Sequence, residues 1–224
     1  MNKKAAIKKA AGTAKRREAD IAYVEIEAMI STMSLPPGSP IVEAEISEAI
    51  QVGRTPVREA LMRLMSIGLV VQQPRRGLLV SPIDLANHLD VIHTRRVLEQ
   101  LIAACTARRA TAAQRSEIVD SAQRMVAAAA RGNLEGYMKA DHELDFVNHA
   151  ACRNASAVTA VLPLVTQCRR FWYAYQHEGE IREGARCHAE LAKGIATGSE
   201  ADAIQGANAL MDYLEAFTRR VIDA

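Results

Sequence analysis

The chain has 224 residues, of which 49% are hydrophobic and 4% aromatic, and its formal net charge at pH 7 is +2. This length suffices for one or two domains with their own cores, and no segment approaches the apolar length of a membrane span. The four cysteines lack CxxC spacing, and no apolar stretch of a signal peptide follows the basic N-terminus. We therefore expect a cytoplasmic protein with reduced thiols and no membrane partner.

The positive charge is concentrated in the first part of the chain. Residues 1–82 carry a formal charge of +4, whereas residues 83–224 carry −2. Binding to phosphate groups requires a positive surface, so the N-terminal part is the candidate for contact with nucleic acid. Residues 1–18 are rich in lysine and arginine, and we expect a flexible basic tail that either follows DNA phosphates or is simply solvated.

The first folded domain is expected over residues 19–82. Recurring apolar residues predict a helix over 20–34, and the proline-rich stretch 35–40 ends it. A short amphipathic helix is predicted over 41–50, followed by a tight turn at 51–53. The apolar residues of the first helix are Ile21, Val24, Ile26 and Ile30.

A second helix is predicted after this turn. Thr55 is expected to cap it, with Pro56 as its first residue, where the missing N–H of proline costs nothing. Gly68 would end it. Arg54 and Arg58 are four residues apart and should project together away from the core. The predicted buried stripe consists of Val57, Leu61 and Leu64.

Two short apolar runs after this helix predict a β-hairpin. Residues 69–73 and 78–80 would be its strands, joined by the loop Pro74–Gly77 with two arginines at its tip. A helix, a short turn, a second helix and a basic hairpin together make a winged helix-turn-helix.

The candidate DNA-binding residues lie on the second helix and on the hairpin tip. Because arginine can bind O6 and N7 of guanine together, Arg54 and Arg58 are predicted to read bases in the major groove. Thr55 is placed to donate to a phosphate. The alternative for the arginines is a solvated surface position. The hairpin residues expected at the neighbouring groove are Arg75, Arg76 and Gly77.

The run LPPGSPIVEAEISEAIQVGRTPVREALMRLMSIGLVVQQPRRGLLV resembles the N-terminal domain of the GntR family of bacterial transcription regulators. The PGS turn, the RTPVREAL helix and the PRRG tip match this family in order and spacing. The resemblance implies sequence-specific DNA binding. The family often has an arginine where this chain has Ala44 and a hydroxyl residue where it has Gly53, so we expect a different operator preference.

Beyond residue 82 the pattern is helical without a convincing strand, which predicts an all-α bundle over residues 83–224 and a mainly α protein. Thr111 and Gln114 form a predicted capping box, and Asn133 and Ser199 are further predicted caps. The predicted helices cover about 85–105, 111–132, 133–154, 158–175, 181–196 and 199–224.

Three segments of this region resemble the FCD domain, the ligand-binding domain of the FadR subgroup of GntR regulators. They are RRVLE (residues 95–99), DHELDFVNHAACRN (141–154) and CHAELAKGIATGS (187–199). The resemblance implies a small acidic metabolite as effector, and Arg95 is predicted to bind its carboxylate because the guanidinium fork fits two oxygens. The alternative for Arg95 is an ion pair with Glu99, one turn further on.

The same resemblance implies a site for one divalent metal. Asp141 matches the family's first ligand and His188 a later histidine, whereas Asp145 replaces a histidine and the last histidine falls near Leu210. The remaining three residues could hold Zn²⁺, Mn²⁺ or Ni²⁺ with water, or contact an effector directly. The alternatives are a solvated Asp145 paired with His149 and an ordinary core histidine at 188.

The leading hypothesis is a homodimeric transcription regulator, most often a repressor in this family, that binds a near-palindromic double-stranded operator. An effector in the bundle would change operator affinity. One alternative is an architectural DNA binder without a ligand. The other is a metal-dependent hydrolase built on Asp141, Asp145 and His188, but no nucleophile–base pair accompanies them, so we expect no enzyme.

Overall fold

The computed structural model of the chain describes residues 3–177 and 179–224, with side chains described from Arg17 onward. These residues form two compact units. The N-terminal unit runs to Ile83 and takes in Arg169–Ala174, and the C-terminal unit comprises Asp84–Cys168 and Tyr175–Ala224. The predicted class, a winged helix-turn-helix followed by a helical bundle, is confirmed. Over the described part of the chain, no helix combines the length and apolarity needed to cross a bilayer.

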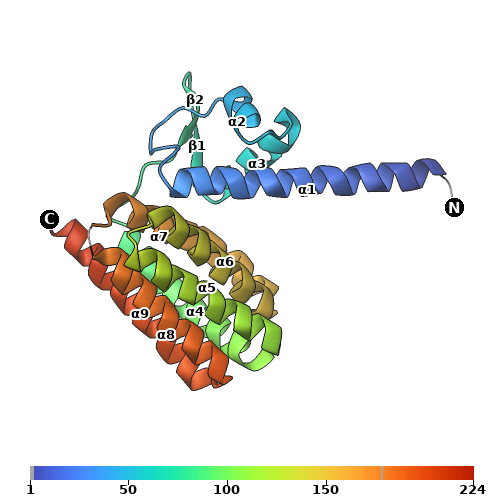
Figure 1. The fold of residues 1–224 in the computed structure, drawn as a ribbon. Coiled ribbons are helices and arrows are strands. Elements are labelled where there is room, and N and C mark those ends of the chain that lie inside the picture. Colours follow the sequence, from blue (N-terminus) through green and yellow to red (C-terminus); the bar gives the residue numbers. More distant parts are fainter. Residues whose placement is uncertain (1–2, 178) are drawn as a thin grey trace. The chain divides into compact units, whose positions relative to one another are not determined.

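Helix α1 (Lys3–Ser31) opens the N-terminal unit (Figure 1). It takes in most of the stretch expected as a basic tail, because alanine, lysine and arginine are good helix formers. The side chains before Arg17 lie outside the described residues, so phosphate contact by this stretch stays a prediction. Ile26 and Ile30 are buried as predicted, but Ile21 and Val24 are exposed because the core-facing stripe instead starts at alanines. That stripe consists of Ala19, Ala22, Ile26 and Ile30.

Helices α2 (Glu43–Ala49) and α3 (Arg54–Ser66) form the helix-turn-helix. α3 begins two residues earlier than predicted, with Gly53 as its N-cap and no side-chain cap. Thr55 therefore lies inside the first turn and does not cap the helix, which corrects the prediction. Pro56 is still accommodated, because N–H groups in the first turn of a helix have no intrahelical partner.

The end of α3 is fixed by Gly68. Its φ of +76° lets the chain reverse, and the N–H of Leu69 donates to the carbonyl of Leu64 at 3.0 Å. With the bond from Gly68 N–H to Met65 O at 3.1 Å, this is a Schellman motif. The predicted stripe of α3 is confirmed, since each member is at most 1% exposed. Its members are Val57, Leu61 and Leu64.

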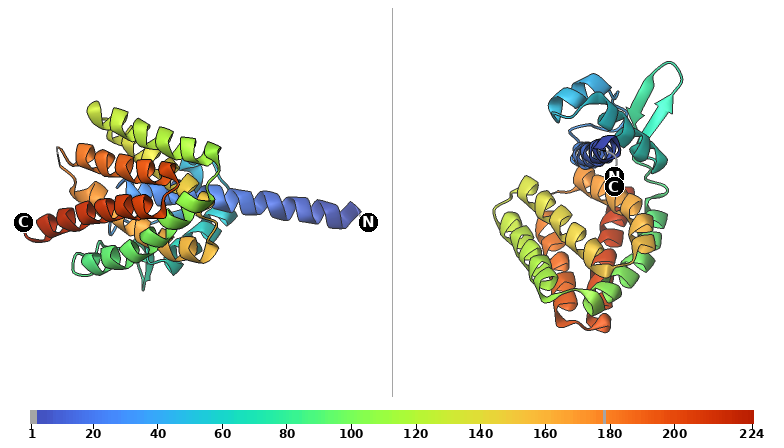
Figure 2. Two further views of the ribbon diagram at one scale, coloured as in Figure 1. Left: turned by 90° about the horizontal axis from the view of Figure 1, so that it is seen from below. Right: turned by 90° about the vertical axis from the view of Figure 1, so that its right-hand side faces the viewer.

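The hairpin consists of β1 (Val70–Gln73) and β2 (Gly77–Val80), which pair antiparallel. Because Gln73 lies opposite Gly77, the loop contains three residues and not the four predicted. On the other side of β2, the N–H of Ile41 donates to Leu78 O at 2.8 Å, so the segment before α2 extends the hairpin. Figure 2 shows the hairpin extending beyond the helices of its own unit.

The last turns of α7 (Ala155–Tyr175) belong to the N-terminal unit. Within that unit, the buried Arg170 donates to Ser81 Oγ at 3.1 Å and to Ser81 O at 2.8 Å. Arg169 Nη1 lies 3.8 Å from the Glu27 carboxylate. α7 is therefore a single helix that contributes residues to both units.

The C-terminal unit is a bundle in which α9 packs on α4 and α8, α5 packs on α6 and α8, and α4 closes the ring against α6 (Figure 1). Val161 and Val165 of α7 pack with Ile102 of α4 and Cys152 of α6. The remaining helices are α4 (His88–Arg109), α5 (Ala112–Ala130), α6 (Leu134–Cys152), α8 (Glu180–Thr197) and α9 (Glu200–Ile222).

The predicted caps of this bundle are confirmed. Thr111 and Gln114 form the capping box that opens α5. The side chain of Asn133 accepts a hydrogen bond from Gly136 N–H at 2.9 Å, and that of Ser199 accepts one from Asp202 N–H at 3.2 Å. These caps satisfy N–H groups that have no partner inside the helix, and they explain why the helices begin where the sequence indicates.

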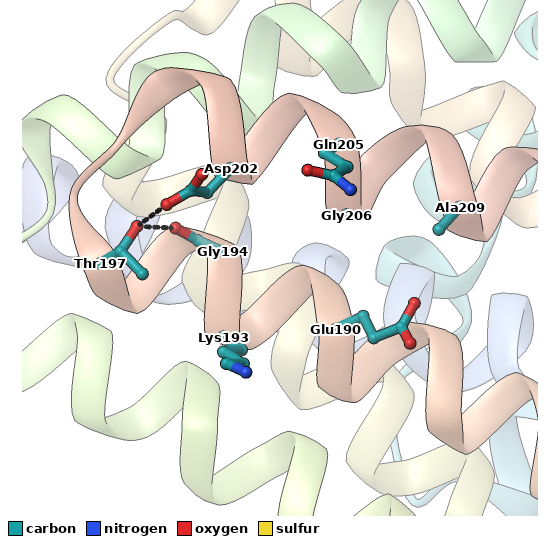
Figure 3. A pocket seen from close by; sticks show the side chains of 8 residues that line it. All are labelled: Glu190, Lys193, Gly194, Thr197, Asp202, Gln205, Gly206 and Ala209. Atoms are coloured by element: carbon teal, nitrogen blue, oxygen red, sulfur yellow. Dashed lines mark hydrogen bonds between the residues drawn. The ribbon is translucent and has the colours of Figure 1, made fainter.

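Two glycines allow α8 and α9 to approach closely. A Cβ at Gly194 would overlap the backbone carbonyl of Asp202, and one at Gly206 would lie 2.6 Å from Leu191 Cα. Beside this contact is a groove of about 300 Å³, shown in Figure 3. At its end, the Thr197 hydroxyl donates to Gly194 O at 2.7 Å and contacts the Asp202 carboxylate at 3.1 Å.

We predict that Gly206→Ala destabilises the protein by about 1–3 kcal/mol, because the added methyl group must push the backbones of α8 and α9 apart. The melting temperature, followed by circular dichroism, should fall by several degrees. Gln205→Ala, at the exposed neighbouring position, is the control and should leave the melting temperature nearly unchanged. Equal melting temperatures for the two variants would contradict the close-packing account.

Candidate nucleic-acid interface and effector site

Arg54, Thr55 and Arg58 lie in the first turns of α3, and all three are exposed. The opposite face of the helix is anchored in the core through its apolar stripe, so the backbone that carries these residues is rigid. A helix N-terminus also favours negative charge, which suits contact with phosphate. The structure thus brings together the three helix residues that the sequence nominated for DNA contact.

Glu43, in the first turn of α2, holds the Arg58 side chain. Arg58 Nε donates to the two Glu43 carboxylate oxygens at 3.0 and 3.2 Å, and Nη2 donates to Oε2 at 2.7 Å. The hydrogen bond from Arg58 lowers the pKa of Glu43, with smaller effects of the charges of Arg58 and Arg54. This side-on pairing uses Nε and Nη2 and leaves Nη1, at the outer edge of the guanidinium, without a bond to Glu43.

Sequence reasoning missed Glu43. The available signal was weak: an acidic residue in the first turn of a helix is common because it complements the helix dipole. That it lies opposite Arg58 follows from the crossing of α2 and α3, which the sequence pattern does not specify.

The hairpin tip presents Arg75 and Arg76, both exposed, next to Gly77. Arg75 adopts a left-handed backbone conformation with φ of +66°, and Arg76 N–H donates to Gln73 O at 3.2 Å. With Pro74 as second residue, this is the pattern of a type II turn, whose third residue is usually glycine. An arginine at this position costs about 1 kcal/mol of backbone strain. The turn therefore presents a positive charge, and the folded protein is less stable than it would be with glycine there.

The C-terminal unit contains a group of five ionisable side chains, here called the interior cluster: Arg95, Glu99, Asp141, Asp145 and His188. Four of them are buried and Asp145 is half-buried.

His188 of α8 and Asp141 of α6 form one pair within the interior cluster. His188 Nε2 lies 3.1 Å from Asp141 Oδ1, and Nδ1 lies 2.8 Å from Gly184 O. Burial alone would lower the pKa of His188, but the Asp141 carboxylate, the Gly184 carbonyl and the charge of Asp145 together raise it. Both ring nitrogens of His188 thus face oxygen atoms, an arrangement that favours the protonated form of the imidazole.

Arg95 and Glu99 of α4 form the second pair, with Arg95 Nε donating to Glu99 Oε1 at 2.9 Å. Burial opposes the charge of Arg95, but Glu99, Cys168 and Asp145 raise the pKa of its guanidinium. Asp145 thus lies within electrostatic range of both Arg95 and His188. The ion pair with Glu99, which the sequence left as an alternative, is present, and it occupies Nε only.

The residues nominated as metal ligands do not make a metal site by themselves. Over the part of the chain that the structure describes, no three histidine, cysteine, aspartate or glutamate side chains are grouped to hold a metal. Asp141 and His188 meet, but Asp145 does not complete a ligand set with them, and Leu210 is buried in α9. The hydrogen bond of His188 to a carbonyl is typical of a ligating histidine, but two protein ligands are too few to hold the ion alone.

Two further polar side chains on α6 were missed. Asn148 accepts a hydrogen bond from the Thr106 hydroxyl at 2.7 Å, while its Nδ2 is buried without a hydrogen-bond partner among the described residues. The Nε2 atom of His149 is in the same situation. The alternative that paired His149 with Asp145 on a solvated face does not fit the burial of His149, which is 9% exposed. All four cysteines are buried thiols.

Comparison with known families decides the class of the chain. Residues 19–80 match the family described as bacterial regulatory proteins, gntR family, and residues 90–213 match the FCD domain, which covers more than half of the chain. The chain is a gntR-family regulator with an FCD domain. Its function is that of this class: a transcriptional regulator with an N-terminal DNA-binding domain and a C-terminal effector-binding domain.

Proteins similar to this gntR-family regulator are also named as transcriptional regulators. An HTH-type transcriptional regulator in the TAR-I ttuE-ttuC' intergenic region of Agrobacterium vitis is 34% identical over 124 residues, which is 54% of this chain and 72% of that protein. The HTH-type transcriptional repressor RspR of Escherichia coli is 30% identical over 105 residues, 47% of this chain and 46% of the repressor.

Solved structures share the fold. The protein described as E. coli McbR/YncC superposes with a TM-score of 0.78 at 16% identity and covers 92% of this chain and 98% of its own. A GntR regulator from Rhodococcus sp. RHA1 gives a TM-score of 0.65 at 19% identity, covering 95% of this chain and 99% of its own.

We predict that Glu43→Gln weakens sequence discrimination without unfolding the regulator. The amide cannot hold Arg58 by two charged contacts, so the guanidinium loses its fixed direction. In fluorescence anisotropy, the affinity ratio between a selected DNA site and random DNA should fall several-fold. Glu48→Gln, later on α2, is the control. An unchanged ratio with Glu43→Gln would show that Glu43 does not position Arg58.

We predict that metal-free protein loses stability as the pH rises above about 6.5, the ordinary pKa of histidine. His188 has a raised pKa in the folded protein, so its contribution is fully present below the unfolded value and is lost as the pH passes the folded one. Melting temperatures in EDTA between about pH 6 and 9 should show this decline, and His188→Gln should remove most of it. An identical decline in His188→Gln would assign it to other groups.

Proposed function

We propose that the chain is a homodimeric repressor that binds a near-palindromic double-stranded operator and responds to a small carboxylate effector in its bundle. The observation that carries the DNA-binding part is the exposed start of α3, where Arg54, Thr55 and Arg58 stand on a helix whose opposite face is buried. Helices of this kind enter the major groove by their N-terminal residues.

In this proposal, base reading and phosphate contact are divided between two elements. Arg58, with its outer edge directed by Glu43, and Arg54 bind guanine edges. Thr55 donates to a phosphate, and Arg75, Arg76 and the Gly77 backbone contact the neighbouring groove from the hairpin tip. The cost of placing Arg75 in a left-handed conformation supports a role for its charge at that spot.

The effector is proposed to bind at the interior cluster of the FCD domain, with Arg95 contacting a carboxylate and Asp141, Asp145 and His188 lining the rest. Burial supports this, because a charged group enclosed in a bundle interacts strongly with a ligand that displaces water. α7 is the proposed route to the other unit: Cys168 lies near Arg95, and the next two residues bind Glu27 and Ser81 within the N-terminal unit.

The proposed dimer follows from the two-fold symmetry of a palindromic site. α4 offers a candidate surface for a second copy, because Val97 and Leu101 are one turn apart and are 66% and 45% exposed. Large apolar side chains grouped on an exposed helix face favour burial by a partner.

The proposal also includes a cellular location and a cofactor. A DNA-binding regulator of this class acts in the cytoplasm, and the chain is proposed to have no catalytic role. A divalent Zn²⁺, Mn²⁺ or Ni²⁺ ion stays a prediction: Asp141 and His188 would supply two ligands, and the effector and water would have to supply the others.

The proposed recognition of DNA bases is tested first with the unmodified protein. Double-stranded sites would be selected by the unmodified protein from a random library, and binding then measured by anisotropy. Arg58→Ala should lose about tenfold or more in affinity for the selected site while keeping its melting temperature, since the side chain is exposed. Arg131→Ala, an exposed arginine of the bundle, should bind normally. Tight specific binding by Arg58→Ala would contradict the proposal.

A further inference from the structure

One large apolar side chain stands among polar ones on the exposed face of α3. Met62 is 57% exposed, more than any other large apolar side chain that the structure describes in the N-terminal unit. It follows Thr55 by seven positions and Arg58 by four, so it lies on the helix face opposite the buried stripe. The face that carries the proposed DNA contacts in the first turns is thus continued by Met62 on the next turn.

The exposed polar side chains that follow Met62 are held within the N-terminal unit. Arg63 Nη1 donates to Asp20 Oδ1 at 2.7 Å, and the guanidinium lies over the Tyr23 ring at 4.3 Å from the ring centroid. The Ser66 hydroxyl donates to the Arg63 carbonyl at 2.7 Å. Because Asp20 and Tyr23 belong to α1, the Arg63 side chain is engaged there. Beyond the second turn of α3, Met62 is therefore the side chain best placed to contact DNA.

The chemistry of methionine suits one group of the major groove. Its thioether has no hydrogen to donate and is a weak acceptor, so it cannot read the donors and acceptors of base edges as an arginine does. The C5-methyl group of thymine is the apolar group that bases present in this groove. An unbranched, polarizable side chain adapts to such a group, and the contact removes apolar surface from water on both sides.

Helix geometry limits where this thymine lies in the DNA. The four residues from Arg58 to Met62 cover about 6 Å along the helix axis. Successive base pairs are about 3.4 Å apart along the duplex. A methyl group in contact with Met62 therefore belongs to a base pair within about two steps of the guanine bound by Arg58.

From these observations we infer that Met62 is a further specificity-determining residue, which packs on the C5-methyl group of a thymine near the guanine bound by Arg58. The inference rests on the proposed DNA binding by α3 and adds an apolar contact to the hydrogen bonds proposed for the arginines. The continuity of Met62 with the face of Arg58 and Thr55 carries it. The operator should accordingly contain this thymine in each half-site.

The experiment removes single methyl groups from a double-stranded site selected by the full-length protein. Each thymine of one half-site is replaced in turn by deoxyuridine, which lacks only the methyl group, and the Kd is measured by fluorescence anisotropy. One replacement should weaken binding about three- to fourfold, the value of one buried methyl group. The guanine bound by Arg58 is the one whose replacement by 7-deazaguanine weakens binding of the unmodified protein but not of Arg58→Ala. The sensitive thymine should lie within about two base pairs of it.

Variants of Met62 assign the effect to its side chain. Met62→Ala and Met62→Gln should bind the thymine and deoxyuridine sites equally, whereas Met62→Leu, which is apolar and of similar size, should keep the preference for thymine. All three should keep the melting temperature of the unmodified protein, because the side chain is exposed. Val126→Ala, at a 45% exposed apolar position of α5, is the matched control and should keep the preference.

Three results would overturn the inference and leave the proposed DNA binding intact. A selected half-site without a methyl-sensitive thymine near the guanine would show that no such contact is made. A preference for thymine that persists in Met62→Ala would assign the methyl group to another side chain. An equal loss of affinity for selected and random DNA in Met62→Ala would place the side chain on the DNA backbone. If neither 7-deazaguanine nor Arg58→Ala weakens binding, the proposed base reading by α3 fails and the inference fails with it.

Discussion

The need to compensate charge inside an apolar bundle is the constraint on which the C-terminal unit depends. Arg95 and Glu99 on α4, Asp141 on α6 and His188 on α8 are all buried, and each has a partner of opposite charge. Removing one partner of such a pair leaves an uncompensated charge and costs several kcal/mol. Stability alone would favour apolar residues at these positions, so the buried charges are consistent with the effector site that we propose for the cluster.

The two units use arginine in opposite ways. In the bundle, Arg95 is buried, and nearby carboxylates stabilise its positive charge. A ligand that changes the charge around Arg95 would therefore change its interactions. On α3, Arg58 is exposed, and Glu43 directs it without removing it from solvent. Water and salt screen the exposed pair, so it contributes direction more than stability. Reading DNA and sensing a metabolite thus place different demands on the same side chain.

Most of the fold followed from the sequence, because local chemistry determines it. The caps at Thr111, Asn133 and Ser199, the Gly68 turn and the α3 stripe each depend on residues a few positions apart. One error is also local: α3 begins at Arg54, with Gly53 in an extended conformation as its N-cap, so Thr55 lies inside the first turn. Contacts between helices were harder to predict from the sequence. The position of Glu43 opposite Arg58, for example, depends on how α2 and α3 cross. At the proposed effector site, the sequence placed Asp141 and His188 in one group, and the structure brings them together. The buried atoms Asn148 Nδ2 and His149 Nε2, which have no hydrogen-bond partner among the described residues, could be found only from the packed bundle.

The central claim is that the charge balance of the bundle and the affinity of α3 for DNA are coupled. The most direct measurement is the Kd for a selected DNA site, by fluorescence anisotropy, with and without a saturating concentration of the metabolite that stabilises the bundle. Coupling between two sites in one protein is typically worth about 1–3 kcal/mol, so the account predicts a change in Kd of about 5- to 150-fold. Identical Kd values, with the metabolite shown to be bound, would contradict it.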